Sequence, residues 1–279
     1  MGWALTAEDG RTGLAKRSKQ HEVGVSSLRR GLDILRAFRA VDAPLSNKEI
    51  SGRAGLPKAT VARLTYTLTR MGYLRQAGPL GQYHLGDKVV TLGQALLRNL
   101  PVCAIAHPLM QVLADEHEMS VALGIGHGSR MIYLDYCSGP KTVAMRLSVG
   151  TLVPMALTAM GRAYLWALSP EQRVAHLRVI EIEAGDRAPQ VLARVYESFE
   201  QIARDGFAVS FGDWRPQVYA VGAPLWLDRG QTVLALNCGA RRPDLVEDIF
   251  RQRLGSSLLA LATEITNAMD SRGGMFWNE

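Results

Sequence analysis

The sequence predicts a two-domain α+β protein that begins with a winged helix-turn-helix. Three observations support this fold class. The length of 279 residues suits two domains. Helix signals followed by a hairpin signal occupy the region before residue 87, and clusters of β-rich runs separated by helical patterns fill the rest. With 47% hydrophobic and 21% charged residues, the composition is that of a globular protein, which excludes a disordered or fibrous chain.

Charge is divided unevenly along the chain. Residues 1–99 carry 16 Lys and Arg against 7 Asp and Glu, a net charge of +9, whereas the remainder carries 16 against 19, a net charge of −3. A basic first third indicates that only this part meets a polyanion such as DNA. Charge alone is equally compatible with a solvated basic face.

The distribution of apolar residues argues against a membrane protein. The most apolar long run, residues 151–168, is interrupted by Arg162, and no run of about 18 uncharged apolar residues occurs. The N-terminus lacks the apolar core of a secretory signal. We therefore expect a cytoplasmic protein that does not enter a membrane.

The cysteines and histidines show no metal-binding pattern. Cys103, Cys137 and Cys238 are odd in number, widely spaced and without a CxxC motif, so we interpret them as reduced core cysteines. The six histidines are scattered without the spacing of metal ligands. No metal and no cofactor is expected.

The first structured element is expected to be a helix that begins at Ser26. Residues 1–24 are basic and lack an apolar period, which predicts a flexible arm. Apolar residues then follow at helical steps: Leu28, Leu32, Leu35 and Phe38. We assign residues 25–86 to one domain.

A second helix is marked at both ends. Ser46 and Glu49 form a capping box, S-x-x-E, and Leu45 and Ile50 occupy the two positions of a hydrophobic staple. Gly55 suits the left-handed residue that ends a helix.

A third helix restarts almost immediately, because Pro57 is tolerated in the first turn of a helix. Its inward stripe is predicted from helical spacing: Val61, Leu64, Leu68 and Met71. Gly72 ends this helix.

A hairpin follows the third helix. Two short extended pieces, residues 73–76 and 82–85, flank the turn sequence AGPLG. Helix, turn, helix and hairpin is the order of a winged helix-turn-helix, whose second helix enters the major groove end first. The residues expected at double-stranded operator DNA are Lys58, Ala59, Thr60 and Arg63 of the third helix, Lys48 of the second, and Gln82 and His84 of the hairpin. A helical hairpin packed against another protein is the alternative, but the caps, the restart, the hairpin and the local positive charge all favour DNA.

Residues 87–100 predict a linker helix, capped by Asp87 and ended before Pro101. Its apolar residues lie on one side: Val89, Leu92, Leu96 and Leu100. This side is a candidate contact between two copies of the chain.

The second domain, residues 101–279, mixes strands and helices. β-rich runs lie at 120–125, 131–136, 143–147, 219–227 and 233–238, and helical patterns at about 104–117, 158–168, 170–180, 189–205 and 243–271. Strands in clusters separated by helices favour an α+β domain with a mainly antiparallel sheet.

An enzyme is the main competing class, and the sequence disfavours it. G-x-S-x-G, P-loop and dinucleotide motifs are absent. A β-rich run follows the glycine-rich residues 124–128, which favours a hairpin turn over a phosphate cradle. Asp135, Asp213 and Asp228 are isolated carboxylates. Asp135 either faces a pocket or lies at the surface, and Asp228 begins a turn. No catalytic residue is expected.

From about Ser26 to about Met269 the chain resembles an IclR-family transcriptional regulator. The first domain carries LDILRAF, LSNKEISGRAGLPKATVARLTYTLTRMGYL and YHLGDKVVTLG, and the second carries LSVGTLVPMALTAMGRAYLWAL and DGFAVSFGDWRPQVYAVGAPLWLDRGQTVLALN. The resemblance implies a GAF-like effector-binding domain, and homodimers or dimers of dimers on DNA. It also implies repression or activation of a catabolic operon. Small organic and aromatic acids are common effectors of such regulators.

The resemblance also implies which residues line an effector pocket: Met145, Val153, Ala159, Met160, Ser210, Val218, Ala220, Asn237 and Gly239. Trp214, Tyr219 and Trp226 lie near this wall in the sequence, and core packing is the favoured interpretation of each. The alternative for Trp214 is that it covers a ligand together with Arg215, in the loop before Pro216. Effector binding would shift the arrangement of the C-terminal domains, and the linker helix would pass this shift to the DNA-binding domains. The alternative function is a DNA-binding protein whose second domain only forms oligomers and takes no ligand.

Overall fold

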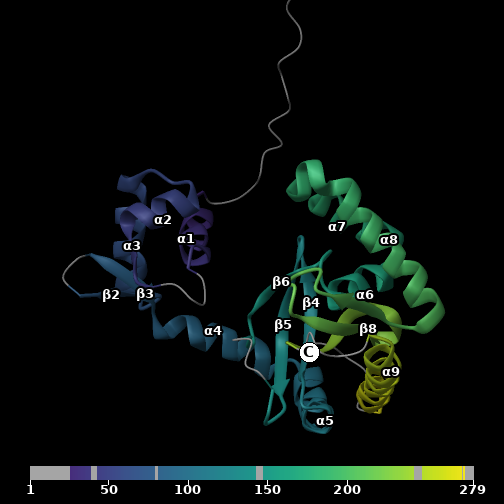
Figure 1. Cartoon of the computed structure of the whole chain (residues 1–279). Helices are drawn as coiled ribbons and strands as arrows, with labels where there is room; N and C mark the ends of the chain where they lie inside the picture. The colour runs from purple at the N-terminus through teal and green to yellow at the C-terminus, as the bar shows by residue number, and fades with distance from the viewer. Residues whose placement is uncertain are drawn as a thin grey trace, which may run out of the picture. The chain divides into compact units, whose positions relative to one another are not determined.

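The computed structural model describes residues 26–38, 43–78, 81–142, 147–241, 247–271 and 273. The chain forms two compact units that divide between Val90 and Thr91. Figure 1 shows the elements of each unit. The expected arm, residues 1–24, lies outside the described residues, as does Met145.

The first unit confirms the winged helix-turn-helix. Its elements are α1 (Ser26–Arg36), β1 (Leu45–Ser46), α2 (Asn47–Ala54), α3 (Lys58–Arg70), β2 (Leu74–Ala77) and β3 (Gln82–Leu85). The strands form an antiparallel sheet of order β1-β3-β2. The short strand β1 was not predicted.

Local interactions explain why α2 begins and ends where it does. The Ser46 hydroxyl accepts the Glu49 N–H at 3.3 Å, and the Glu49 carboxylate accepts the Ser46 N–H at 2.8 Å. Leu45 and Ile50, the staple pair, are both buried in the core of this unit. Gly55 ends the helix with φ of 65°, in the left-handed region.

Two of the predicted apolar stripes are partly wrong. In α1, Leu28 and Leu32 are exposed, while Ile34 and Ala37 are buried, because the helix packs through the neighbouring face. In α3, Met71 is exposed at the end of the helix. Thr65 is buried instead, and its hydroxyl lies 2.9 Å from the Val61 carbonyl and 3.1 Å from Asn47 Oδ1.

Helix α4 (Asp87–Arg98) has no buried residue and ends two residues earlier than predicted. Leu100 is buried just beyond it, and α5 (Pro101–His117) starts at Pro101, with its proline in the first turn.

The second unit is built on a six-stranded antiparallel sheet, as predicted. Its further elements are β4 (Ser120–His127), β5 (Arg130–Ser138), β6 (Leu152–Pro154), α6 (Ala159–Ala167), α7 (Pro170–Ala184), the 3-10 turn η1 (Gly185–Arg187), α8 (Ala188–Asp205), β7 (Ala208–Phe211), β8 (Tyr219–Leu227), the 3-10 turn η2 (Asp228–Gly230), β9 (Thr232–Ala240) and α9 (Glu247–Asp270). The strand order is β6-β5-β4-β9-β8-β7. The two edge strands, β6 and β7, were not predicted, and most of the expected strand 143–147 lies outside the described residues.

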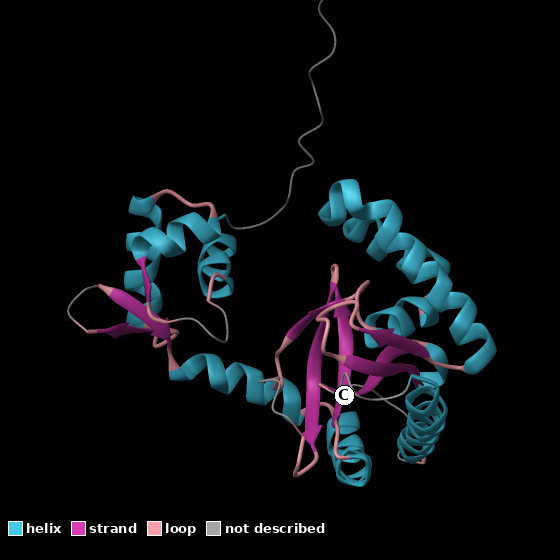
Figure 2. Cartoon of the chain, in the orientation of Figure 1, coloured by secondary structure: helices cyan, strands magenta, loops and turns pink. Residues whose placement is uncertain are grey.

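Helices cover both faces of this sheet (Figure 2). One core joins α5 and α9 to the sheet, and a second core joins α6, α7 and α8 to the opposite face. Residues 124–128 belong to the β4–β5 hairpin, where Gly128 turns with φ of 59°, as predicted. Asp228 likewise begins the turn between β8 and β9.

A β-bulge in β5 determines which side chains face which core. Asp135 pairs with Leu123 and Tyr133 pairs with Gly124, so Leu134 is an extra residue between them. Tyr133 belongs to the core on the α6 side, whereas Leu134 and Cys137 belong to the core on the α5 side. The bulge therefore reverses the alternation of side chains along the strand.

Among the described residues, no single helix has the length and apolar composition needed to cross a membrane; α4 and α5 meet that test only as a bent pair.

Candidate functional site

The turn between α2 and α3 presents the start of α3 to solvent. The Ser51 carbonyl accepts the N–H groups of Gly55 and Leu56, and the Ser51 hydroxyl donates to the Leu56 carbonyl at 2.6 Å. Pro57 stands one residue before α3 rather than in its first turn, which corrects the prediction. No side chain caps α3, so its first N–H groups can bind an anion.

The residues predicted to contact DNA lie on the surface of the first unit. Lys58, Ala59 and Arg63 are exposed on α3, and Thr60 is half-buried beside them. Lys48 is exposed on α2. Gln82 and His84 are two residues apart on β3, so their side chains point to the same face of the wing.

The sequence analysis missed two further candidates on this unit. Arg75 is exposed and lies directly opposite His84 in the β2–β3 ladder, which places a positive charge beside His84. Tyr66 is exposed on α3 one turn after Arg63. Arg75 lies on β2 and Tyr66 in the middle of α3, so neither belongs to the first turn of α3.

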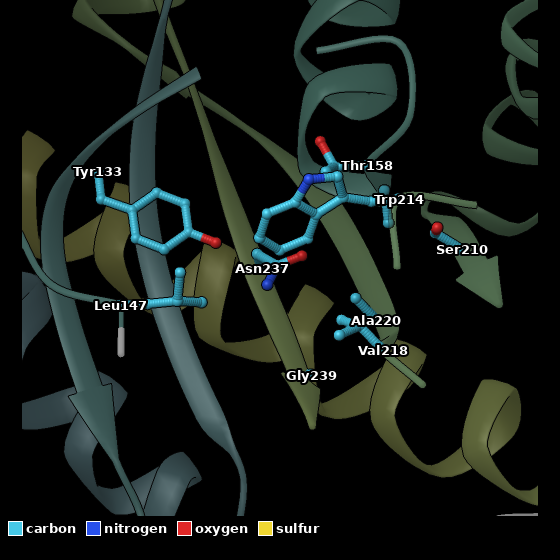
Figure 3. Close-up of a pocket in the computed structure, with 10 residues that line it drawn as sticks. Tyr133, Leu147, Thr158, Ser210, Trp214, Val218, Ala220, Asn237 and Gly239 are labelled. Atoms are coloured by element: carbon cyan, nitrogen blue, oxygen red, sulfur yellow. The ribbon is translucent and has the colours of Figure 1, made fainter. Parts of the chain in front are cut away.

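A small cavity lies in the second unit between β5, α6 and the loop after β7 (Figure 3). Six of the nine predicted effector residues line it: Ala159, Ser210, Val218, Ala220, Asn237 and Gly239. Val153 and Met160 do not line this cavity; both are buried in the adjoining core. Helical rotation directs Met160 toward Gly124 of β4, while Ala159 packs on Gly222 of β8.

Four residues that the resemblance did not assign also line the cavity: Tyr133, Leu147, Thr158 and Trp214. Thr158 caps α6 by accepting the Gly161 N–H and donates its hydroxyl to the Pro154 carbonyl at 2.8 Å. The Arg215 guanidinium lies 4.2 Å from the centre of the Trp214 ring. Figure 3 shows the Trp214 ring facing the side of the cavity that Tyr133 lines.

The cavity has a volume of about 20 Å³, which holds about one water molecule. Two aromatic residues, Tyr133 and Trp214, contribute to its apolar wall, and Thr158, Ser210 and Asn237 provide polar groups. Any larger ligand therefore requires side chains to move. Trp214 lies in the loop between β7 and β8, whereas Tyr133 lies in strand β5. Of the two aromatic side chains, Trp214 is therefore the one that is not held by a regular element.

A buried ion pair supports this loop. Arg162 of α6 is 3% exposed and lies 2.9 Å from Asp213, which also accepts the Ser210 hydroxyl at 3.3 Å. Burial lowers the pKa of the Arg162 guanidinium, and Asp213 acts in the opposite direction. Arg162 and Asp213 also border a polar cleft of about 380 Å³, so the ion pair lies between the two cavities.

Comparisons with known proteins agree along nearly the whole chain. The family described as "Bacterial transcriptional regulator IclR C-terminal" matches residues 94–267, and "IclR helix-turn-helix domain" matches residues 27–78. The regulator TsaQ1/TsaQ2 of Comamonas testosteroni is 30% identical over 247 residues, 88% of each chain.

Solved structures show the same likeness. An IclR-family regulator from Brucella abortus is 34% identical, with a TM-score of 0.80 over 92% of this chain and 96% of its own. An IclR homologue from Microbacterium hydrocarbonoxydans, solved with 4-hydroxybenzoate, shares the fold at 19% identity, with a TM-score of 0.71 over 88% of this chain and 100% of its own. The curated relatives are named as transcriptional regulators and repressors rather than enzymes.

Proposed function

The chain belongs to the IclR family of bacterial transcriptional regulators, with a DNA-binding helix-turn-helix domain and a C-terminal effector domain, and we propose that a small organic or aromatic acid is its effector. The regulated genes would then form a catabolic operon, repressed or activated by the protein. We assign residues 25–86 to DNA binding, 87–100 to the linker helix and 101–279 to the effector domain, and we expect the protein to act in the cytoplasm on double-stranded operator DNA.

The DNA contacts that we propose centre on the start of α3. Lys58, Thr60 and Arg63 surround its uncapped N-terminus, where N–H groups and positive charge favour phosphate. The small Ala59 lets the helix approach the groove closely. Lys48, Gln82 and His84 would extend the contact along the DNA backbone.

The pairing of Tyr133 with Trp214 in one cavity is the observation that carries the effector proposal. Aromatic side chains with a few polar groups are typical of sites for small organic ligands. The protein of the same fold solved with 4-hydroxybenzoate gives a concrete aromatic acid to test. We propose that Trp214 swings out to admit such an acid and that Thr158, Ser210 and Asn237 bind its polar groups. Ala159, Val218, Ala220 and Gly239 would complete the wall, and Met145 is retained as a candidate outside the described residues.

Regulation would follow from a difference in effector affinity between two arrangements of the protein. An effector shifts DNA affinity only by its preference for one arrangement over the other. A coupling free energy of about 1–3 kcal/mol would change operator affinity roughly 5–150-fold.

The first test measures the thermal midpoint against a panel that contains benzoate, 4-hydroxybenzoate and pyruvate. At about 100 times its dissociation constant, a ligand of the native state adds roughly 2.7 kcal/mol of stability, which raises the midpoint by several degrees. The methyl ester of each active acid is the control, because it lacks the charge. No saturable shift with any acid would favour the alternative, a second domain that only forms oligomers; the small volume of the cavity is the observation on its side.

The second test measures DNA binding separately. Arg63→Ala should weaken binding to DNA selected by the wild-type protein from a random pool, by about 1–3 kcal/mol or roughly 5–150-fold. Its thermal shift with the effector should be unchanged. Arg178→Ala, the same charge change on an exposed helix of the second unit, should leave DNA binding intact. Equal DNA binding by Arg63→Ala and the wild type would refute the assignment of α3.

A further inference from the structure

Three metal-ligating side chains converge on the face of the sheet opposite the effector cavity. His107 Nδ1 lies 3.0 Å from both carboxylate oxygens of Asp135 and 3.6 Å from Cys137 Sγ. The ligand atoms of all three residues lie within 4.8 Å of one another. His107 precedes Asp135 by 28 residues and Cys137 by 30 residues. This separation is too long for a recognisable metal-binding motif, so the sequence does not indicate the cluster.

The β-bulge at Leu134 explains the convergence. By plain alternation Tyr133, Asp135 and Cys137 would share one face of β5. The extra residue turns Asp135 and Cys137 toward His107 of α5, while Tyr133 keeps facing the effector cavity. Asp135 is therefore neither in the effector cavity nor at the open surface, the two positions that the sequence allowed.

We propose that His107, Asp135 and Cys137 bind a divalent transition-metal ion, with Zn²⁺ as the best match. Imidazole, thiolate and carboxylate are the ligands of zinc, whereas Ca²⁺ and Mg²⁺ prefer oxygen alone. Zinc sits about 2.0–2.2 Å from nitrogen or oxygen and about 2.3 Å from sulfur, so tetrahedral ligands lie roughly 3.3 Å apart for N and O and roughly 3.6 Å for N and S. The N–O and N–S distances here are 3.0 and 3.6 Å, and all three ligand atoms lie within 4.8 Å of one another, so the Asp135 carboxylate would move to complete the tetrahedral geometry.

The surroundings suit an ion that can exchange with solvent. The side chains of His107 and Asp135 are 55% and 11% exposed, and Cys137 is 2% exposed, so the site is open on the histidine side. That side leaves room for water as a fourth ligand. The Tyr136 N–H donates to Asp135 Oδ1 at 2.7 Å and orients the carboxylate.

The charge of the site also favours a cation. The carboxylates of Asp135 and Asp115 place negative charge near the Cys137 sulfur. A bound Zn²⁺ would offset these negative charges and displace the thiol proton, which is released to solvent. A plain ion pair between His107 and Asp135 would leave the thiol protonated.

The experiment uses untagged full-length protein that has been stripped with a chelator and then titrated with Zn²⁺ by calorimetry and with Co²⁺ by absorption. We expect one ion per chain. Bound Co²⁺ should show the visible bands of four-coordinate cobalt and a thiolate charge-transfer band. His107→Ala should weaken Zn²⁺ binding by at least about 100-fold, and Cys137→Ser should abolish the charge-transfer band.

Matched controls separate this site from adventitious binding. His127 is exposed, so His127→Ala removes a surface histidine, and Cys238→Ser removes a buried thiol of the same core; both should bind Zn²⁺ like the wild type. Because Cys137 is buried, Cys137→Ser could unfold, but His107 is exposed and His107→Ala should keep the midpoint of the metal-free protein. Absence of stoichiometric binding by the wild type, or undiminished binding by His107→Ala, would overturn the proposal.

Discussion

At the scale of single residues, Gly222 lets strand β8 approach the start of helix α6 closely. A Cβ atom there would lie 2.3 Å from the carbonyl carbon of Ala159 and 2.4 Å from its oxygen, both of them backbone atoms. Neither atom can move without displacing the start of α6. The position of Ala159 in the cavity wall therefore requires a glycine at position 222.

Gly222→Ala should destabilise the second unit by about 1–3 kcal/mol, because the backbone must shift to admit the methyl group. Urea denaturation followed by circular dichroism would measure the loss. Gly52→Ala is the control: Gly52 is exposed in helix α2 with no atom within 4 Å of the added Cβ, and the change should stabilise by about 0.5–1 kcal/mol. A neutral Gly222→Ala would contradict the packing described for β8 and α6.

The buried ion pair gives a second prediction at this scale. Asp213→Ala removes the partner of a cation that is 3% exposed, so it should lower the free energy of unfolding by about 3 kcal/mol. Glu197→Ala breaks the exposed pair with Arg194 and should lower it by less than about 1 kcal/mol. Equal effects of the two changes, measured by urea denaturation, would show that burial of Arg162 does not matter.

Some residues of the site could be predicted from the sequence and others could not. Ala159, Ser210 and Asn237 were found because the resemblance runs through their segments. Trp214 was judged a core residue, since an aromatic ring in a chain of this composition is more often packed than bound to a ligand. The grouping of His107 with Cys137 depends on the β-bulge, which no periodicity reveals.

At the scale of elements, Ser46→Ala tests the capping box of α2. Loss of the hydroxyl leaves the Glu49 N–H without its side-chain acceptor, which should lower the stability of the first unit by about 1 kcal/mol. Thermal unfolding is the measurement. Thr67→Ala, an exposed change within α3, should be neutral or slightly stabilising, since alanine has the higher helix propensity.

Long elements were predicted well and short ones were missed. The helices and the central strands carry enough residues to show a period, and capping residues mark several of the ends. Strands β1, β6 and β7 have two to four residues each, and only pairing with a neighbouring strand defines them. Of the stripe predicted for α1, Leu35 and Phe38 pack against the core, whereas Leu28 and Leu32 are apolar but stay exposed.

At the scale of the whole molecule, the unburied apolar side of α4 predicts a homodimer. Leu92 and Leu96, four residues apart on one side of α4, are 58% and 44% exposed. A cluster of large apolar residues in water favours association with a second copy. We expect the double substitution of Leu92→Glu and Leu96→Glu to give a monomer by light scattering.

Ile182→Glu is the control for that experiment. Ile182 is the most exposed large apolar residue described, at 77%, but it lies on α7 rather than α4. Its substitution should leave the oligomeric state unchanged. A dimer that dissociates with Ile182→Glu and persists with the α4 variant would place the interface elsewhere.

The bulge at Leu134 has a genetic consequence. Strands β4 and β5 pair on both sides of it, with the register shifted by one residue at the bulge, so the extra residue is absorbed locally. Removing the Leu134 codon would shorten the strand by a residue and leave Tyr133 facing one core and Cys137 the other. Loss of a codon elsewhere in the strand, with no bulge to absorb it, would exchange the two faces. Position 134 is thus a position in β5 where one residue can be deleted while the other side chains of the strand keep facing the same sides of the sheet.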